Sequence, residues 1–255
     1  MKWMRNLADR LLYSRDPALT GSPARRSMDL LILQTAFFSA FSVFTGGIYL
    51  TGYLLFVGAP DYLVSYVPVL GNVCSILLVL FSTFVDRQEY RKKVTILFSI
   101  LSKVLLFLLA WVPFVYTGSC DYLLVFLLLA AGQTAAAVSS LAYNIWYNAL
   151  IPEEIRGRYF SARQLPALLV SLLLPVAAGK LLDSAQQPYY GFALLFTLGA
   201  VCGGLEVLSL SRIEDVRVGR LPQKAGVFRA LLIPLKNREF MRYTLTLCAF
   251  YLFLY

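Results

Sequence analysis

Six long apolar segments constrain this sequence more than any other feature, because each can cross a lipid bilayer as a helix. They cover residues 30–56, 62–84, 94–116, 122–150, 160–182 and 189–210. About 20 apolar residues are needed for such a helix, whereas barrel strands alternate over about ten residues, a pattern absent here. Only 15% of the residues are charged, against about a quarter in soluble domains. The sequence therefore predicts an all-α, polytopic membrane protein built on a six-helix bundle.

Lysine and arginine residues are distributed unevenly between the predicted loops. Most of the 23 precede the first segment or follow the second, fourth and sixth segments, whereas the loops at 57–61, 117–121 and 183–188 hold none. Because cytoplasmic loops are enriched in these cations, the pattern predicts a multi-pass protein of the cell membrane with a cytoplasmic N-terminus. Topology and attraction to anionic membrane lipids then explain the net charge of +9, and nucleic acid is not expected as a partner.

The apolar segments divide the chain into four predicted parts. Residues 1–28 form a cytoplasmic tail, 29–210 the six-helix bundle, 211–238 a cytoplasmic loop and 239–255 the start of a seventh span. Short interfacial helices are expected over residues 3–11 and 227–235. The seventh apolar run begins near Tyr243 and is too short to cross a bilayer, so we expect a fragment that ends inside this span.

The residue inventory argues against enzymatic and metal chemistry. The chain has no histidine, which removes the usual base of Ser-His catalysis and a common ligand of zinc and haem. The four cysteines, Cys74, Cys120, Cys202 and Cys248, lack metal-ligand spacing and are interpreted as packing residues. We therefore predict no cofactor, no metal and no enzymatic activity.

A short charged hairpin separates the second and third apolar segments and reads F-S-T-F-V-D-R-Q-E-Y-R-K-K-V over residues 81–94. With six spans and a long basic loop before the seventh run, the sequence resembles the N-terminal half of a major facilitator superfamily transporter. The motif of that family between spans two and three is roughly G-x-x-x-D-R-x-G-R-K. Asp86 and Arg87 match its centre, and Arg91, Lys92 and Lys93 stand for its basic end, whereas its glycines are replaced.

This resemblance implies a twelve-span fold whose missing C-terminal half would complete the chain. It also implies that Asp86, Arg87, Arg91 and Lys92 form a cytoplasmic gate, in which the carboxylate contacts the other half when that side is closed. The alternative is a solvated hairpin that only fixes topology.

Two polar stripes are candidates for a substrate cavity, since the resemblance implies that spans one and four line it. The residues of each stripe share one face of a helix. Hydroxyl and amide groups on a membrane span are expected to face protein or water and not lipid. Close packing between helices is the alternative. The residues are Thr35, Ser39, Ser42, Gly46, Tyr49 and Tyr53 in span one, and Gln133, Ala137, Ser140, Asn144 and Tyr147 in span four.

Lys103 lies about 15 Å into the third segment, near the membrane midplane, where an ionisable group is a functional candidate. The alternative is a structural lysine bonded to a carbonyl or hydroxyl group. Asn72, Arg163 and Gln164 are lesser candidates. Glu206 lies about one turn inside the end of the sixth segment and could reach Arg212 or water, so a structural ion pair is expected for it.

These features predict a secondary transporter that moves a small organic solute by alternating access, driven by the solute gradient or by a coupled proton or Na⁺. A coupling carboxylate would lie in the missing half, because none is expected near the midplane here. The alternative function is a non-transporting membrane receptor or assembly protein of the same fold. A sugar, a peptide and an organic anion would suit the polar residues equally.

Overall fold

The computed structural model describes residues 23–115, 122–151, 153–185, 188–217 and 237–254. Within these ranges the chain is helical throughout, apart from short connections. The interfacial helices predicted at residues 3–11 and 227–235 lie outside the described residues, as does Cys120. The elements are α2 Pro23–Thr45, α3 Gly47–Phe56, α4 Asp61–Asp86, α5 Arg91–Val115, α6 Tyr122–Leu150, the 3-10 helix η3 Glu153–Ile155, α7 Arg156–Ser184, α8 Pro188–Ser211 and α10 Arg238–Leu254.

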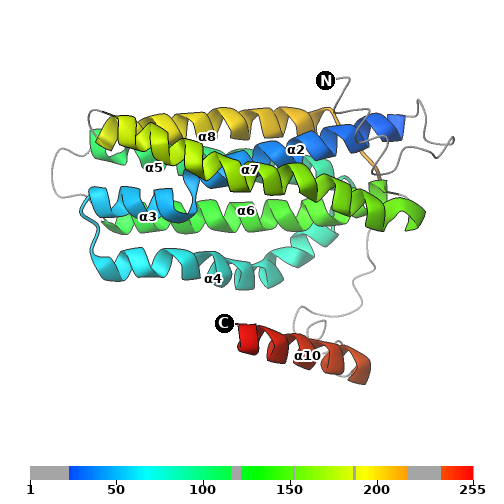
Figure 1. Ribbon diagram of the computed structural model, residues 1–255. Coiled ribbons are helices and arrows are strands. Elements are labelled where there is room, and N and C mark those ends of the chain that lie inside the picture. Colours follow the sequence, from blue (N-terminus) through cyan, green and yellow to red (C-terminus); the bar gives the residue numbers. More distant parts are fainter. Residues whose placement is uncertain (1–22, 116–121, 152, 186–187, 218–236, 255) are drawn as a thin grey trace.

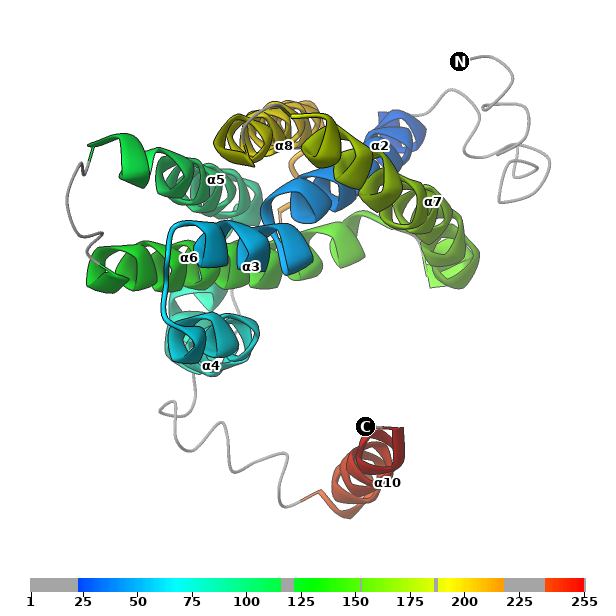
Figure 2. The ribbon, with the colours of Figure 1, turned by 60° about the vertical axis from the view of Figure 1, so that its left-hand side comes forward.

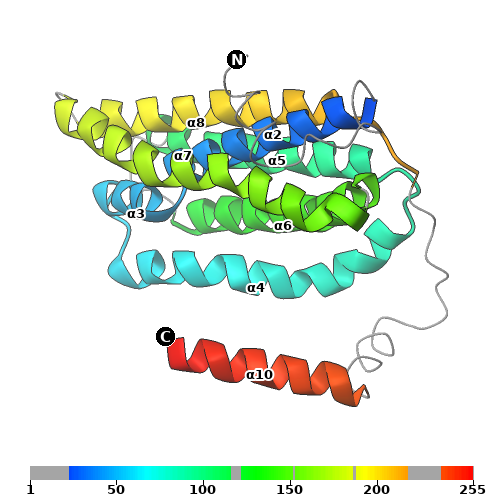
Figure 3. The same ribbon diagram turned by 45° about the vertical axis from the view of Figure 1, so that its right-hand side comes forward.

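The long helices from α2 to α8 lie side by side in one bundle, as Figures 1 and 3 show. α2 packs against α8 and α7, α5 lies between α6 and α8, and α4 covers the far side of α6. Figure 2 shows α10 apart from this bundle, and none of its described side chains is buried. The bundle formed by α2 to α8 therefore holds the packed interior.

Five of the helical stretches are long and apolar enough to cross a membrane, which supports a multi-pass membrane protein. They are Arg25–Phe56, Asp61–Leu78, Leu124–Leu150, Arg156–Ser184 and Tyr189–Ser211. α5 coincides with the predicted third span but is not among the five, and it carries three cations in its first turn and Lys103 at its centre. The crossing of the membrane by α5 therefore stays a prediction.

The first predicted span, 30–56, differs from the structure at both ends of α2. The helix already begins at Pro23, so the predicted tail boundary at residue 28 falls inside it, and the side chain of Met28 is fully buried. At its other end α2 stops at Thr45, and α3 starts after a break at Gly46. Gly47 has a φ of 51°, a left-handed conformation that glycine adopts without the usual steric penalty. The span is therefore two helices joined at a glycine pair.

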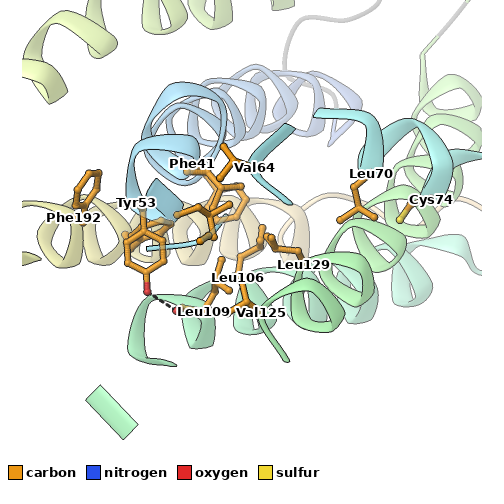
Figure 4. Close-up of a cluster of buried hydrophobic side chains, with 14 residues drawn as sticks. Phe41, Tyr53, Val64, Leu70, Cys74, Leu106, Leu109, Val125, Leu129 and Phe192 are labelled. Atoms are coloured by element: carbon orange, nitrogen blue, oxygen red, sulfur yellow. Dashed lines mark hydrogen bonds between the residues drawn. The ribbon is translucent and has the colours of Figure 1, made fainter. Parts of the chain in front are cut away.

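Two apolar clusters pack the opposite ends of the bundle. The larger surrounds Tyr53 and includes Leu106, Leu129 and Phe192; Figure 4 shows the Tyr53 hydroxyl donating to the Leu109 carbonyl, at 2.9 Å. The second cluster lies where α2 begins and α8 ends, and it includes Met28, Leu31, Trp146, Tyr159 and Leu210. Polar residues are concentrated between the two clusters.

The outer face of α7 is apolar, with Leu168, Leu172 and Val176 more than half exposed. Exposed leucine and valine of this kind are expected on a helix that faces lipid, because a water-facing surface would place polar residues there. α7 continues through both of its prolines, Pro166 and Pro175.

Candidate functional site

A cavity of about 290 Å³ lies inside the bundle, between the two apolar clusters. Residues of α2, α5 and α6 form most of its wall, and α7 and α8 each add one charged side chain, Arg163 and Glu206. Phe38, Ser42, Ser140 and Asn144 line it and are exposed, so the cavity opens between α2 and α6.

Six of the nine side chains predicted for a substrate cavity line this space. They come from three different helices and are Thr35, Ser42, Lys103, Gln133, Ser140 and Asn144. Tyr147 lies beside the cavity, where its ring stacks on that of Tyr143 at 5.0 Å between centroids. The structure thus gathers part of each predicted stripe around one hollow, while their role in substrate binding stays a prediction.

Ser39 and Tyr49 lie elsewhere, on a shallow hollow between α2, α3 and α7. The Tyr49 hydroxyl donates to the Pro175 carbonyl of α7, at 2.6 Å. For Tyr49 the cause is the break at Gly46 and Gly47, whereas Ser39 precedes the break and lies on α2 itself. A constant helical stripe from Thr35 to Tyr53 assumes an unbroken helix, and the break gives α3 its own orientation.

Lys103 forms a buried ion pair with Glu206, with 2.7 Å between Nζ and Oε2. The two side chains are 11% and 4% exposed. The ammonium also donates to Ser99 Oγ at 2.6 Å and lies 5.1 Å from the centre of the Phe41 ring. These partners offset the cost of holding a cation inside a membrane bundle.

Glu206 thus forms an ion pair, as expected, but its partner is Lys103 and not Arg212. The carboxylate points into the bundle because α5 packs directly against α8. Gly203, one turn earlier on α8, makes room for the lysine: a Cβ there would lie 2.7 Å from Lys103 Cδ. Glu206 is the only acidic residue within the six predicted spans, a signal that could have identified it as the partner of Lys103.

Gln34 joins the ion pair to the rest of the cavity, a residue that the sequence analysis did not single out. Its Nε2 donates to Glu206 Oε1 at 3.1 Å, and its Oε1 accepts from the Tyr143 hydroxyl at 2.9 Å. Both ends of the amide are thus hydrogen-bonded, which fixes its orientation. Gln34 and Tyr143 are both buried.

Arg163, which the sequence analysis named only as a lesser candidate, lines the other side of the cavity. Its Nε donates to the Thr35 hydroxyl, which itself donates to the Leu31 carbonyl at 2.8 Å. Its guanidinium carbon lies 5.3 Å from the Tyr143 ring centre and 4.7 Å from that of Tyr147. A planar cation against two aromatic faces is a stabilising arrangement that lysine would reproduce less well.

The side chains of the predicted gate do not line the cavity. Arg91 is fully buried, yet its nearest carboxylate is Asp86, 4.0 Å away and 37% exposed. Lys92 Nζ donates to the Ser211 and Ile213 carbonyls at 2.8 and 2.6 Å, at the end of α8. Arg87 is exposed.

The charged hairpin thus holds α5 to the end of α8 by contacts inside the described chain. Glu89 adds an ion pair to Arg217, at 3.1 Å, just beyond that end. Nearby, burial raises the pKa of Asp215 above its ordinary value, although the charges of Lys92 and Lys93 oppose that shift. A gating role for Asp86, Arg87, Arg91 and Lys92 stays a prediction.

Comparison with known proteins gives no family for this chain: no protein-family model matches it, and a search of curated proteins finds no match. The structure itself supports a helical protein with five candidate membrane-spanning helices. The resemblance to the major facilitator superfamily therefore rests on the motif and the predicted topology of the sequence alone.

Proposed function

We propose that this protein is a secondary transporter of the major facilitator type, in which the bundle from α2 to α8 forms one wall of the route taken by a small organic solute. The observation that supports it is a cavity of about 290 Å³ inside a bundle of candidate membrane-spanning helices, with charged and amide side chains in its wall. Its size is near the lower end of the range for small-molecule sites, about 300 Å³ and above.

The charged groups favour a functional cavity over a structural core. Ionisable side chains inside a membrane cost about 2.5 kcal/mol or more each on insertion scales, so bundles rarely keep them without use. Here Lys103, Glu206 and Arg163 all line one hollow. The same fold could have been packed with apolar residues, as the clusters at both ends of the bundle are.

The exposed opening between α2 and α6 fits an alternating-access mechanism. Ser42, Ser140 and Asn144 would be poorly solvated by lipid, so protein is expected to cover them. In the proposed transporter a second six-helix half supplies this cover and rocks against the first. Glu206 then provides a buried carboxylate in this half that a coupled proton or Na⁺ could use, in place of one in the other half.

Flux through proteoliposomes tests the proposal. The full-length protein, with any residues that follow Tyr255 in its reading frame, would be reconstituted and supplied with labelled solutes that include sugars, peptides and organic anions. We expect saturable, protein-dependent uptake of at least one class. The charge-neutral double variant Lys103→Met with Glu206→Gln should lose that uptake, whereas Lys180→Met, an exposed lysine outside the cavity, should retain it.

A folded protein that moves no solute of the panel, and that copurifies with a stable protein partner, would overturn the transporter and support the receptor or assembly protein. Uptake that the double variant retains would leave transport standing but remove the cavity as its site.

A further inference from the structure

We infer that the cavity accepts a small, singly charged organic anion, and that the guanidinium of Arg163 binds its carboxylate. This inference rests on the proposed function, because it names the class of solute that the same cavity would carry. Of the two cations that line the cavity, Lys103 pairs with Glu206, and Arg163 has no counter-charge among the described residues.

The charge balance of the cavity supports this choice of ligand. Of the residues that line it, Lys103 and Arg163 are cations and Glu206 is the one anion. Glu206 is already engaged on both oxygens, by Lys103 at 2.7 Å and by Gln34 at 3.1 Å. No carboxylate lies within ion-pair distance of Arg163 in the described part of the chain. The cavity thus carries one positive charge in surroundings of low dielectric constant.

The geometry of Arg163 leaves its binding edge free. Nε is used by Thr35, and the stacked rings of Tyr143 and Tyr147 lie together on one side of the group, 5.3 and 4.7 Å from its central carbon. The two terminal nitrogens donate no hydrogen bond to any described residue. A guanidinium that is held through Nε and by the rings beside it presents its two terminal nitrogens as a fork, which matches a carboxylate in a bidentate pair.

The other classes of solute fit less well. A cationic solute would meet a like charge at Arg163 and a carboxylate that is already paired. A neutral sugar could use the amides of Gln133 and Asn144 but would leave the guanidinium uncompensated. A cavity of about 290 Å³ further favours a small molecule such as a short-chain or aromatic monocarboxylate.

Binding to the purified full-length protein in detergent tests this without any transport step. The probes are acetate, propionate and benzoate, each compared with its neutral amide of the same shape: acetamide, propionamide and benzamide. Apparent dissociation constants follow from the rise of the melting temperature with ligand concentration. We expect carboxylates to bind about tenfold or more tightly than their amides, because only they form charge-assisted hydrogen bonds. Equal affinity for acids and amides across the panel would overturn the inference, and the wild-type protein alone decides this.

Variants then locate the site. Arg163→Gln should weaken carboxylate binding about tenfold or more and leave amide binding unchanged. Arg158→Gln, on the same helix but exposed and outside the cavity, should leave the binding of both unchanged. Arg163→Lys should fall between, because it keeps the charge but loses the fork. Undiminished carboxylate affinity in Arg163→Gln would place the anion elsewhere and overturn the inference.

The two proposals fail separately. Uptake of neutral or cationic solutes that does not depend on Arg163 would support the transporter and contradict the anion site. Carboxylate binding that requires Arg163, in a protein that shows no flux, would leave the anion site standing and remove the transporter.

Discussion

α5 carries two buried cations whose surroundings are opposite. Lys103, at the centre of the helix, meets a carboxylate, a hydroxyl and an aromatic face. Arg91, at the start of the helix, is fully buried, but none of its three guanidinium nitrogens has a hydrogen-bond partner in the described part of the chain. Asp86 is its nearest carboxylate, at 4.0 Å.

The difference teaches that burial alone does not identify a charge that stabilises this bundle. A buried donor lowers the free energy of the folded state only when its partners replace the water it has lost. Lys103 has such partners from α5, α2 and α8, whereas Arg91 adds its cation to a helix N-terminus that already carries partial positive charge. We therefore expect the two residues to respond in opposite ways to substitution.

The largest effect is expected for Lys103→Met. Removal of the ammonium leaves Glu206 buried without a counter-charge, which typically costs about 3 kcal/mol or more. Reversible unfolding of the detergent-solubilised protein, followed by circular dichroism, should show this loss. The control is Lys103→Met combined with Glu206→Gln, which removes both charges and should recover most of the stability. A double variant as unstable as Lys103→Met would show that packing of the lysine stem, and not the charge pair, stabilises this region.

Gln34→Leu should come next, at about 1–2 kcal/mol, the range of hydrogen bonds between membrane helices. It removes the donor to Glu206 and the acceptor of Tyr143 while it keeps the volume of the side chain. The same unfolding measurement checks it. We expect the losses of stability in Gln34→Leu and Lys103→Met to be strongly coupled, because both substitutions act on Glu206. A loss in the combined Gln34→Leu, Lys103→Met variant equal to the sum of the two single losses would contradict this.

A smaller loss, about 0.5–1 kcal/mol, is expected for Lys92→Met. This lysine is half-buried and binds two carbonyls at the end of α8, groups that water can partly satisfy after the substitution. Faster hydrogen exchange at the end of α8, with little change in the middle of the bundle, would be its signature. Unchanged exchange there would mean that the lysine does not hold the helix end.

Arg91→Met should change the stability of this chain least, within about 1 kcal/mol and in the stabilising direction, because it removes unpaired buried donors while Asp86 keeps its contact with solvent. Lys92→Met, its immediate neighbour, is the matched control. If Arg91→Met destabilises the protein more than Lys92→Met does, the arginine has partners beyond the described residues and the contrast with Lys103 is broken.

The positions of the helices could be predicted from the sequence because apolar length is a local property. The predicted segment 122–150 coincides with α6, and 189–210 differs from α8 by one residue at each end. The break after Thr45 was not predicted because Gly46 was interpreted only as a small residue of the stripe and Gly47 was given no role. A glycine pair inside a predicted span is the local signal that could have indicated it.

The partners of the charged residues could not be predicted, because they depend on which helices become neighbours. Lys103 was identified as buried from its depth, but its pairing with Glu206 requires that α5 pack against α8. Likewise, nothing near Arg163 in the sequence indicates that Thr35 and two tyrosines of α6 surround it. The partner expected for Glu206 was wrong because Arg212, a neighbour in sequence, was the one cation considered.

The glycine joint between α2 and α3 has a mechanical consequence. No backbone hydrogen bond of the α2 ladder continues through the turn at Gly47, so α3 can tilt without unwinding α2. Such a tilt would have to break two hydrogen bonds, which the Tyr49 and Tyr53 hydroxyls donate to backbone carbonyls of α7 and α5. The angle between α2 and α3 is therefore set by side-chain contacts of α3 with α5 and α7 and not by a continuous backbone ladder.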